Sequence, residues 1–351
     1  MKRTERKYRY FWMTGLIAAM ILAGCAQDEE AAEEEEDLAE EDVAEEEPEA
    51  EEEEEEEAGT EEQQEDEAEE DNGEAFPVTL TDDAGNEVTI EEEPEEIISI
   101  QASFTETLFE LGVGDRLIGV SDFCNYPEET EDIETVGGQD MNDELILSLL
   151  PDLVFVTDYH YENHGATLEQ FEEAGIDVFV VGSTESFDGV YDKISLMGEA
   201  VGVNDEAADI IEDMQTRYDE IAEEAEAVEE EKTVWVEVSP EPDIFTTGQN
   251  TFMHEMLELI EAENAAAEEE GWISITEEEA VQFDPDVILT TYHSDDVYGD
   301  IASREGWEEV PAVAEERIYE VEEDTVVRPG PRLIEGVETL AELVYPDIFA
   351  E

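Results

Sequence analysis

Two stretches of the chain repeat one pattern 134 residues apart. The first reads Pro151-Asp152-Leu153-Val154-Phe155-Val156-Thr157, with Tyr159-His160 close behind. The second reads Pro285-Asp286-Val287-Ile288-Leu289-Thr290-Thr291, with Tyr292-His293 directly after it. Each pattern predicts the end of a helix, a short buried strand and an aromatic loop, because a continuous apolar run is typical of strands covered on both faces.

A glutamate precedes each stretch at the same distance. Glu144 lies seven residues before Pro151, and Glu278 lies seven residues before Pro285. Pro-Asp is also a common way to leave a helix, and 108 of the 351 residues are Asp or Glu. The repeat alone therefore leaves open whether the two halves of the chain are related.

Short apolar runs alternate with amphipathic stretches on both sides of the repeats. We expect a hairpin at 78–90, helices near 103–111, 143–149, 168–174, 252–260 and 333–343, and strands at 97–100, 117–120, 153–156, 178–181, 233–238, 287–290 and 318–321. Strands that alternate with helices predict an α/β protein with layered sheets.

One segment, residues 204–228, breaks this alternation. Its apolar residues recur at helical spacing with acidic residues between them, and it contains neither Gly nor Pro. These features predict a single rod-like helix about 37 Å long.

The N-terminus has the pattern of an export signal. Five basic residues fall within the first nine, an apolar run follows at 11–22, and Leu22-Ala23-Gly24-Cys25 comes next. The run is too short for an ordinary membrane-spanning helix. Leu-Ala-Gly-Cys resembles a bacterial lipobox, which implies cleavage of residues 1–24 and lipidation of Cys25. An ordinary signal peptide with a coincidental cysteine is the alternative.

The charge of the chain is unevenly distributed. The formal net charge is −95, and residues 25–75 contain 31 acidic residues with no Lys or Arg, which predicts an extended, solvated tether. A calcium-collecting tail is the alternative. Residues 76–351 contain 76 acidic and 8 basic residues, a balance that excludes nucleic-acid binding and is typical of a halophilic acidic surface adapted to concentrated salt.

From residue 76 onward the chain resembles the cobalamin and iron-siderophore substrate-binding proteins of ABC importers. The resemblance is carried by an ordered series of motifs, namely Ile97–Ile100 leading to Thr105-Glu106, Leu111–Val120, Asn125-Tyr126-Pro127, Val136-Gly137-Gly138, the two repeats, and Arg328-Pro329-Gly330-Pro331-Arg332. It implies two Rossmann-like lobes, 76–203 and 230–351, joined by one long helix at 204–229. The ligand cleft would lie between the lobes.

The resemblance also implies partners. The lipid-anchored protein would deliver its ligand outside the cell membrane to a permease dimer driven by a cytoplasmic ATPase. Glu144 and Glu278 match the acidic residues with which family members contact the permease, one in each lobe. Two solvated acids on helix surfaces are the alternative.

For the ligand, the resemblance implies a corrinoid, with a ferric siderophore or haem as alternatives. Its cobalt or iron would belong to the ligand, so no separate cofactor or protein metal site is expected. The candidate ligand-binding residues are aromatic, polar and basic residues of the loops after the strands, namely Phe123, Tyr126, Tyr159, His160, Trp272, Tyr292, Asp324 and Arg328. Trp272 also fits a core position, and His160 also fits a polar rim.

Common catalytic motifs are absent from the sequence. It contains no Gly-x-Ser-x-Gly, His-Glu-x-x-His, Cys-x-x-Cys or Walker loop. We therefore expect a binding protein rather than an enzyme, and a ligand-sensing or adhesive surface lipoprotein is a further alternative.

Overall fold

The computed structural model describes residues 76–350, so the export signal, Cys25 and the acidic tether lie outside the described residues. Two four-stranded parallel sheets are the main elements of this part of the chain. No helix within residues 76–350 is both long and apolar enough to cross a membrane.

The first sheet has the strand order β4-β3-β5-β6. Its strands are β3 (Ile97–Ser99), β4 (Leu117–Val120), β5 (Leu153–Thr157) and β6 (Asp177–Val181). The connecting helices are α1 (Ala102–Glu110), α2 (Asp143–Leu149), α3 (Asp158–Asn163) and α4 (Gly165–Glu173), and α5 (Phe187–Val201) follows β6. An antiparallel hairpin of β1 (Val78–Thr81) and β2 (Glu87–Ile90) precedes the sheet, as the sequence predicts.

The second sheet has the order β12-β11-β7-β9. Its strands are β7 (Thr233–Glu237), β9 (Glu263–Asn264), β11 (Val287–Thr290) and β12 (Ile318–Glu320). Helices of this lobe are α7 (Phe252–Leu259), α8 (Glu277–Ala280), α9 (Val297–Ala302), α10 (Pro311–Ala314), α11 (Glu323–Val327), α12 (Leu333–Val344) and α13 (Pro346–Phe349). A second hairpin pairs β8 (Ile244–Thr247) with β10 (Trp272–Ile275).

The two sheets have the same topology. In each, the first strand of the chain lies inside the sheet, the second pairs on one side of it, and the third and fourth lie on the other side. The Pro-Asp repeat explains part of this likeness. Asp152 accepts hydrogen bonds from the amides of Glu95 and Glu96, just before β3, and Asp286 accepts one from Thr233 at the start of β7. Each aspartate therefore joins the first and third strands of its sheet.

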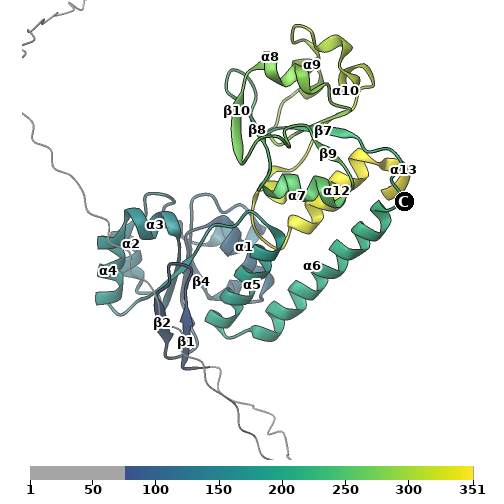
Figure 1. The fold of residues 1–351 in the computed structure, drawn as a ribbon. Helices are drawn as coiled ribbons and strands as arrows, with labels where there is room; N and C mark the ends of the chain where they lie inside the picture. Colours follow the sequence, from purple (N-terminus) through teal and green to yellow (C-terminus); the bar gives the residue numbers. More distant parts are fainter. Residues whose placement is uncertain (1–75, 351) are drawn as a thin grey trace, which may run out of the picture. The chain divides into compact units, whose positions relative to one another are not determined.

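Helix α6 (Asn204–Ala225) is the rod that the sequence predicts. It packs against α5 from the first lobe and against α7 and α12 from the second. Figure 1 shows it running beside both lobes. It is therefore the long helix that joins the two lobes of this α/β fold.

Helix α5 is absent from the sequence prediction. It contains Gly189 and Gly198, which weaken a helical pattern. The structure gives a reason for Gly198, because a Cβ there would lie 2.6 Å from the Cβ of Ala207. The glycine allows α5 and α6 to pack closely.

Candidate functional site

The topology of the first sheet defines a crevice. The chain leaves β3 toward one side of the sheet and leaves β5 toward the other, and ligands of open α/β sheets bind where neighbouring connections diverge in this way. A pocket of about 330 Å³ lies at this place. It is lined by residues within 100–104, 157–160 and 181–185, and by Phe123, Gly138, Gln139, Phe252, Val327 and Pro329. We call it the strand-end pocket.

Three of the eight candidate ligand-binding residues line this pocket: Phe123, Tyr159 and His160. The Phe123 side chain is 63% exposed, and Tyr159 is 42% exposed. Large apolar rings with this exposure offer flat surfaces to a ring-shaped ligand.

His160 lies behind these rings and is only 3% exposed. Its Nε2 lies 3.0 Å from the Gly138 carbonyl oxygen, and its Nδ1 lies 2.7 Å from the Thr157 hydroxyl. Burial lowers the pKa of His160, and the nearby His164 lowers it further against the opposing effect of the Gly138 bond. Both ring nitrogens are therefore occupied within the protein.

The charged groups of the strand-end pocket are acidic. Asp158 and Glu185 line it. Burial raises the pKa of Asp158, but hydrogen bonds from Ser183 and from the Tyr159 amide lower it overall. Partial desolvation raises the pKa of Glu185, and the Trp272 indole opposes this shift. The pocket therefore favours neutral or positively charged groups. A fourth candidate, Trp272, is exposed and does not line the pocket.

Three further candidates belong to an ionic cluster outside the pocket lining. Arg328 pairs with Glu106 on α1, lies 2.6 Å from Asp324 and donates to Asn125. Tyr126 stacks on another guanidinium, with the Cζ of Arg332 3.9 Å from its ring centroid. Arg328 is a candidate ligand-binding residue, but in the structure its guanidinium is paired with protein carboxylates.

The last candidate, Tyr292, lies at the corresponding crevice of the second sheet. Its hydroxyl donates to Glu237, a fully buried carboxylate that also forms a two-bond ion pair with Arg304 at 2.6 Å. Burial and this hydrogen bond raise the pKa of Tyr292. The hydroxyl is thus held by the protein.

Every basic side chain of residues 76–350 is already bonded. The partners are Glu93 for Arg116, Asp83 for Lys193, Glu338 for Arg217, the Val344 carbonyl for Lys232, Glu237 for Arg304, Glu315 for Arg317, and Glu106 for both Arg328 and Arg332. In this part of the chain, therefore, every basic side chain has a protein partner, and none lines the strand-end pocket.

The two glutamates of the repeat occupy equivalent positions. Glu144 and Glu278 are each the second residue of a helix, after the side-chain caps Asn142 and Thr276. Both are exposed. A residue in the left-handed conformation, Leu150 or Asp284, ends the segment before each Pro-Asp.

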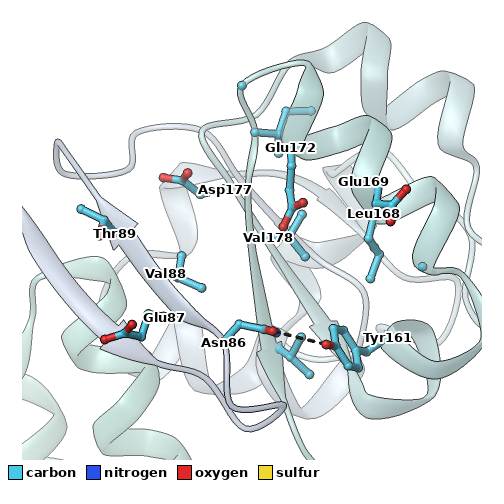
Figure 2. A pocket seen from close by; sticks show the side chains of 14 residues that line it. Asn86, Glu87, Val88, Thr89, Tyr161, Leu168, Glu169, Glu172, Asp177 and Val178 are labelled. Carbon is cyan, nitrogen blue, oxygen red and sulfur yellow. Dashed lines mark hydrogen bonds between the residues drawn. The ribbon is translucent and has the colours of Figure 1, made fainter.

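A larger hollow lies along the side of the first sheet. This lateral groove of about 690 Å³ runs between β2 on one side and β6 and α4 on the other (Figure 2). Glu87, Glu172 and Asp177 line it, and Tyr161 donates to Asn86 across one end. It follows the outer edge of β6 rather than the strand ends, so the strand-end pocket is the candidate ligand site.

Sequence reasoning missed the loop after β6. Residues 182–185 line the strand-end pocket, and Asp158 is fixed by Ser183 at 2.8 Å. The rule that nominates loops after strands applies to this loop as well, so the signal was present in the sequence. Phe252 comes from the second lobe, and no local pattern marks it.

Two parallel-sheet lobes, one joining helix and an aromatic pocket at the strand ends define a two-lobed solute-binding protein. The chain belongs to the periplasmic binding protein family, whose model matches residues 97–325. Its reported relatives are binding proteins rather than enzymes, in agreement with the sequence prediction.

Similarity to individual proteins extends over most of the chain. An uncharacterised ABC transporter substrate-binding lipoprotein of Bacillus subtilis, YvrC, is 44% identical over 281 residues, which cover 79% of this chain and 88% of YvrC. A cobalamin-binding protein of Halobacterium salinarum is 29% identical over 278 residues, 76% of this chain and 74% of that protein. The crystal structure of a possible iron-binding, periplasmic solute-binding protein of Staphylococcus epidermidis matches with a TM-score of 0.66 and 30% identity, covering 72% of this chain and 100% of that one.

Proposed function

We propose that this protein is the substrate-binding lipoprotein of an ABC importer and that its ligand is a corrinoid. The role in an importer is supported by the family and by the 44% identity to a lipoprotein named for it. The corrinoid is supported by the relative in Halobacterium salinarum named a cobalamin-binding protein.

The observation that carries the choice of ligand is the charge of the strand-end pocket. Its charged residues are Asp158 and Glu185, and all eight basic side chains of residues 76–350 have protein partners. A corrinoid presents neutral amides around its ring, whereas haem presents two carboxylates and many ferric siderophores are anionic. Burying an unpaired carboxylate beside other carboxylates is strongly unfavourable.

An iron complex is the second candidate. It is favoured by the 30% identity to the Staphylococcus epidermidis protein whose name gives possible iron binding. A cationic or neutral ferric siderophore, like a corrinoid, would bring no negative charge into the acidic pocket. Haem would bring two carboxylates, so the charge of the complex distinguishes this candidate from haem.

Delivery requires an anchor and a docking surface. Cys25 is the proposed lipidation site, and the acidic tether then holds the folded part outside the membrane. Glu144 and Glu278 are the proposed contacts to a permease dimer, because equivalent acids on lobes of the same topology can meet equivalent basic groups on a two-fold symmetric partner. A cytoplasmic ATPase would drive the permease.

The test is calorimetric titration of the mature chain with cyanocobalamin, haem, and one anionic and one cationic ferric siderophore. We expect saturable one-to-one binding of cyanocobalamin and weak or absent binding of haem and the anionic siderophore. Binding of the cationic siderophore alone would replace the proposed ligand. Failure of all four to bind would remove the assignment of the ligand class.

A further inference from the structure

The ring of Phe123 lies close to the backbone at Gly138. A Cβ built at Gly138 would lie 2.6 Å from Cε2 of Phe123, closer than real Cβ contacts. Gly138 is therefore the residue that allows the ring to lie against the chain at this point. The location of this glycine fixes where the exposed face of Phe123 stands in the strand-end pocket.

His160 holds Gly138 in place. A carbonyl oxygen can only accept a hydrogen bond, so the 3.0 Å contact to Gly138 places the proton on Nε2. Nδ1 is then the acceptor and receives the Thr157 hydroxyl at 2.7 Å. The neutral imidazole thus links the loop that carries Gly138 to the start of α3.

The same histidine also contacts the second exposed aromatic residue of the pocket, Tyr159. The rings of Tyr159 and His160 meet edge to face, with centroids 5.6 Å apart. Because His160 is 3% exposed, it contributes little surface of its own to the pocket. Through its contacts with Gly138 and Tyr159, His160 supports the aromatic residues that do face the pocket.

We propose that His160 is a positioning residue, which fixes Gly138 and through it presets the Phe123 ring for a flat ligand. This inference rests on the proposed function in taking the strand-end pocket as the ligand site. A side chain that is already held in position loses less conformational entropy when the ligand binds than one that must first be ordered. The lowered pKa of His160 agrees with the neutral form that the contacts require.

The test compares two replacements of His160 by their affinity for cyanocobalamin. A Gln amide can donate to Gly138 and accept from Thr157, whereas Leu fills similar space and can do neither. We expect His160→Leu to weaken binding about 10-fold, the effect of losing one orienting hydrogen bond, and His160→Gln to restore most of the affinity. Equal binding by parent and His160→Leu would overturn the proposal, and so would equal losses in both variants, which would indicate direct ligand contact by the imidazole.

A second variant keeps the proposal testable if His160→Leu fails to fold. Gly138→Ala leaves His160 intact but pushes against the Phe123 ring, so we expect a similar loss of affinity. Gly165→Ala is the matched control, because a Cβ there meets nothing within 4 Å. Unchanged binding in Gly138→Ala would contradict the proposal.

A readout without ligand separates this inference from the proposed function. A Phe123→Trp reporter is measured by fluorescence in the parent, His160→Gln and His160→Leu backgrounds, with Trp272→Phe to remove the exposed indole of that residue. We expect the emission maximum to shift in the Leu background and to stay in the Gln background. Unchanged emission in both backgrounds contradicts the positioning role, whereas failure of cyanocobalamin to bind the parent contradicts only the proposed ligand.

Discussion

Glu106 and Arg332, 226 positions apart in the chain, form a two-bond ion pair between the lobes. Arg332 Nε lies 2.9 Å from one carboxylate oxygen and Nη2 lies 3.0 Å from the other. Glu106 is 2% exposed and also pairs with Arg328. Helix α6 is therefore not the only link between the lobes, because this cluster joins α1 to the start of α12.

Removing Glu106 should lower the stability of the protein strongly. Glu106→Ala leaves two largely buried guanidinium groups without their shared partner, and breaking a buried pair in this way costs about 3–5 kcal/mol. Urea unfolding at a fixed, molar salt concentration measures the loss. Glu93→Ala is the control, because its carboxylate is 55% exposed in its pair with Arg116, and we expect a change below about 1 kcal/mol. Equal losses of stability in the two variants would show that the Glu106 cluster does not hold the two lobes together.

The second buried pair, Glu237 with Arg304, allows a sharper comparison. Arg304→Met should destabilise by about 3–5 kcal/mol, because it leaves a fully buried carboxylate with only the Tyr292 hydroxyl. Replacing both residues, as Glu237→Leu with Arg304→Met, should recover most of the loss, since no unpaired charge remains. Thermal or urea unfolding of the parent and of these two variants measures the difference, and a double variant as unstable as the single one would contradict this expectation.

Two histidines should shape the pH dependence of stability in opposite directions. Burial lowers the pKa of His160 below 6.5, so its contribution is complete above pH 6.5 and is lost as the pH falls through the folded-state value. The hydrogen bond to Glu320 raises the pKa of His293, so its contribution is complete below 6.5 and is lost as the pH rises. We expect His160→Gln to reduce the loss of stability on the acid side, and His293→Gln to reduce the loss at higher pH. Unfolding curves from pH 5 to 8 test both signs, and the same sign for both variants would be inconsistent with these contacts.

Docking should depend on the two repeat glutamates and not on charge in general. Glu144→Gln with Glu278→Gln should leave ligand affinity unchanged while lowering ligand-dependent ATPase activity of the reconstituted importer, because the charge-assisted pairs with the permease are lost. Glu223→Gln with Glu224→Gln, on the exposed face of α6, removes the same charge elsewhere. Full activity in the first double variant, or equal losses in both, would remove the docking role.

The sequence predicts the regular part of this fold well. The hairpin, β4, α2 and β11 have the predicted bounds, and α6 is the predicted rod, because periodicity and turn residues act locally in these elements. The repeat is also structural, since Asp152 and Asp286 join equivalent strands. Helix α5 is missed because it contains two glycines, and the packing that favours one of them, Gly198, comes from α6.

The candidate site is predictable only in part. Position soon after a strand places Phe123, Tyr159 and His160 at one pocket, because the carboxyl ends of parallel strands share an edge. Tyr159 and His160 lie in α3, however, and not in the loop that the sequence predicts. The same rule cannot show which partner a side chain takes. Arg328 forms an ion pair with Glu106, more than 200 residues away, and the Tyr292 hydroxyl donates to Glu237. Both pairings depend on tertiary packing.

The central claim, a pocket for a corrinoid with uncharged groups around its ring, is tested most directly by a matched pair of ligands. Calorimetric titration of the mature chain compares cyanocobalamin with a derivative in which one side-chain amide is hydrolysed to a carboxylate. We predict one-to-one binding of cyanocobalamin. The affinity for the acid should be lower by a factor of about 10 or more, since the added charge meets acidic groups without an unpaired base. Absence of cyanocobalamin binding, together with tight binding of haem or an anionic siderophore, would contradict the account.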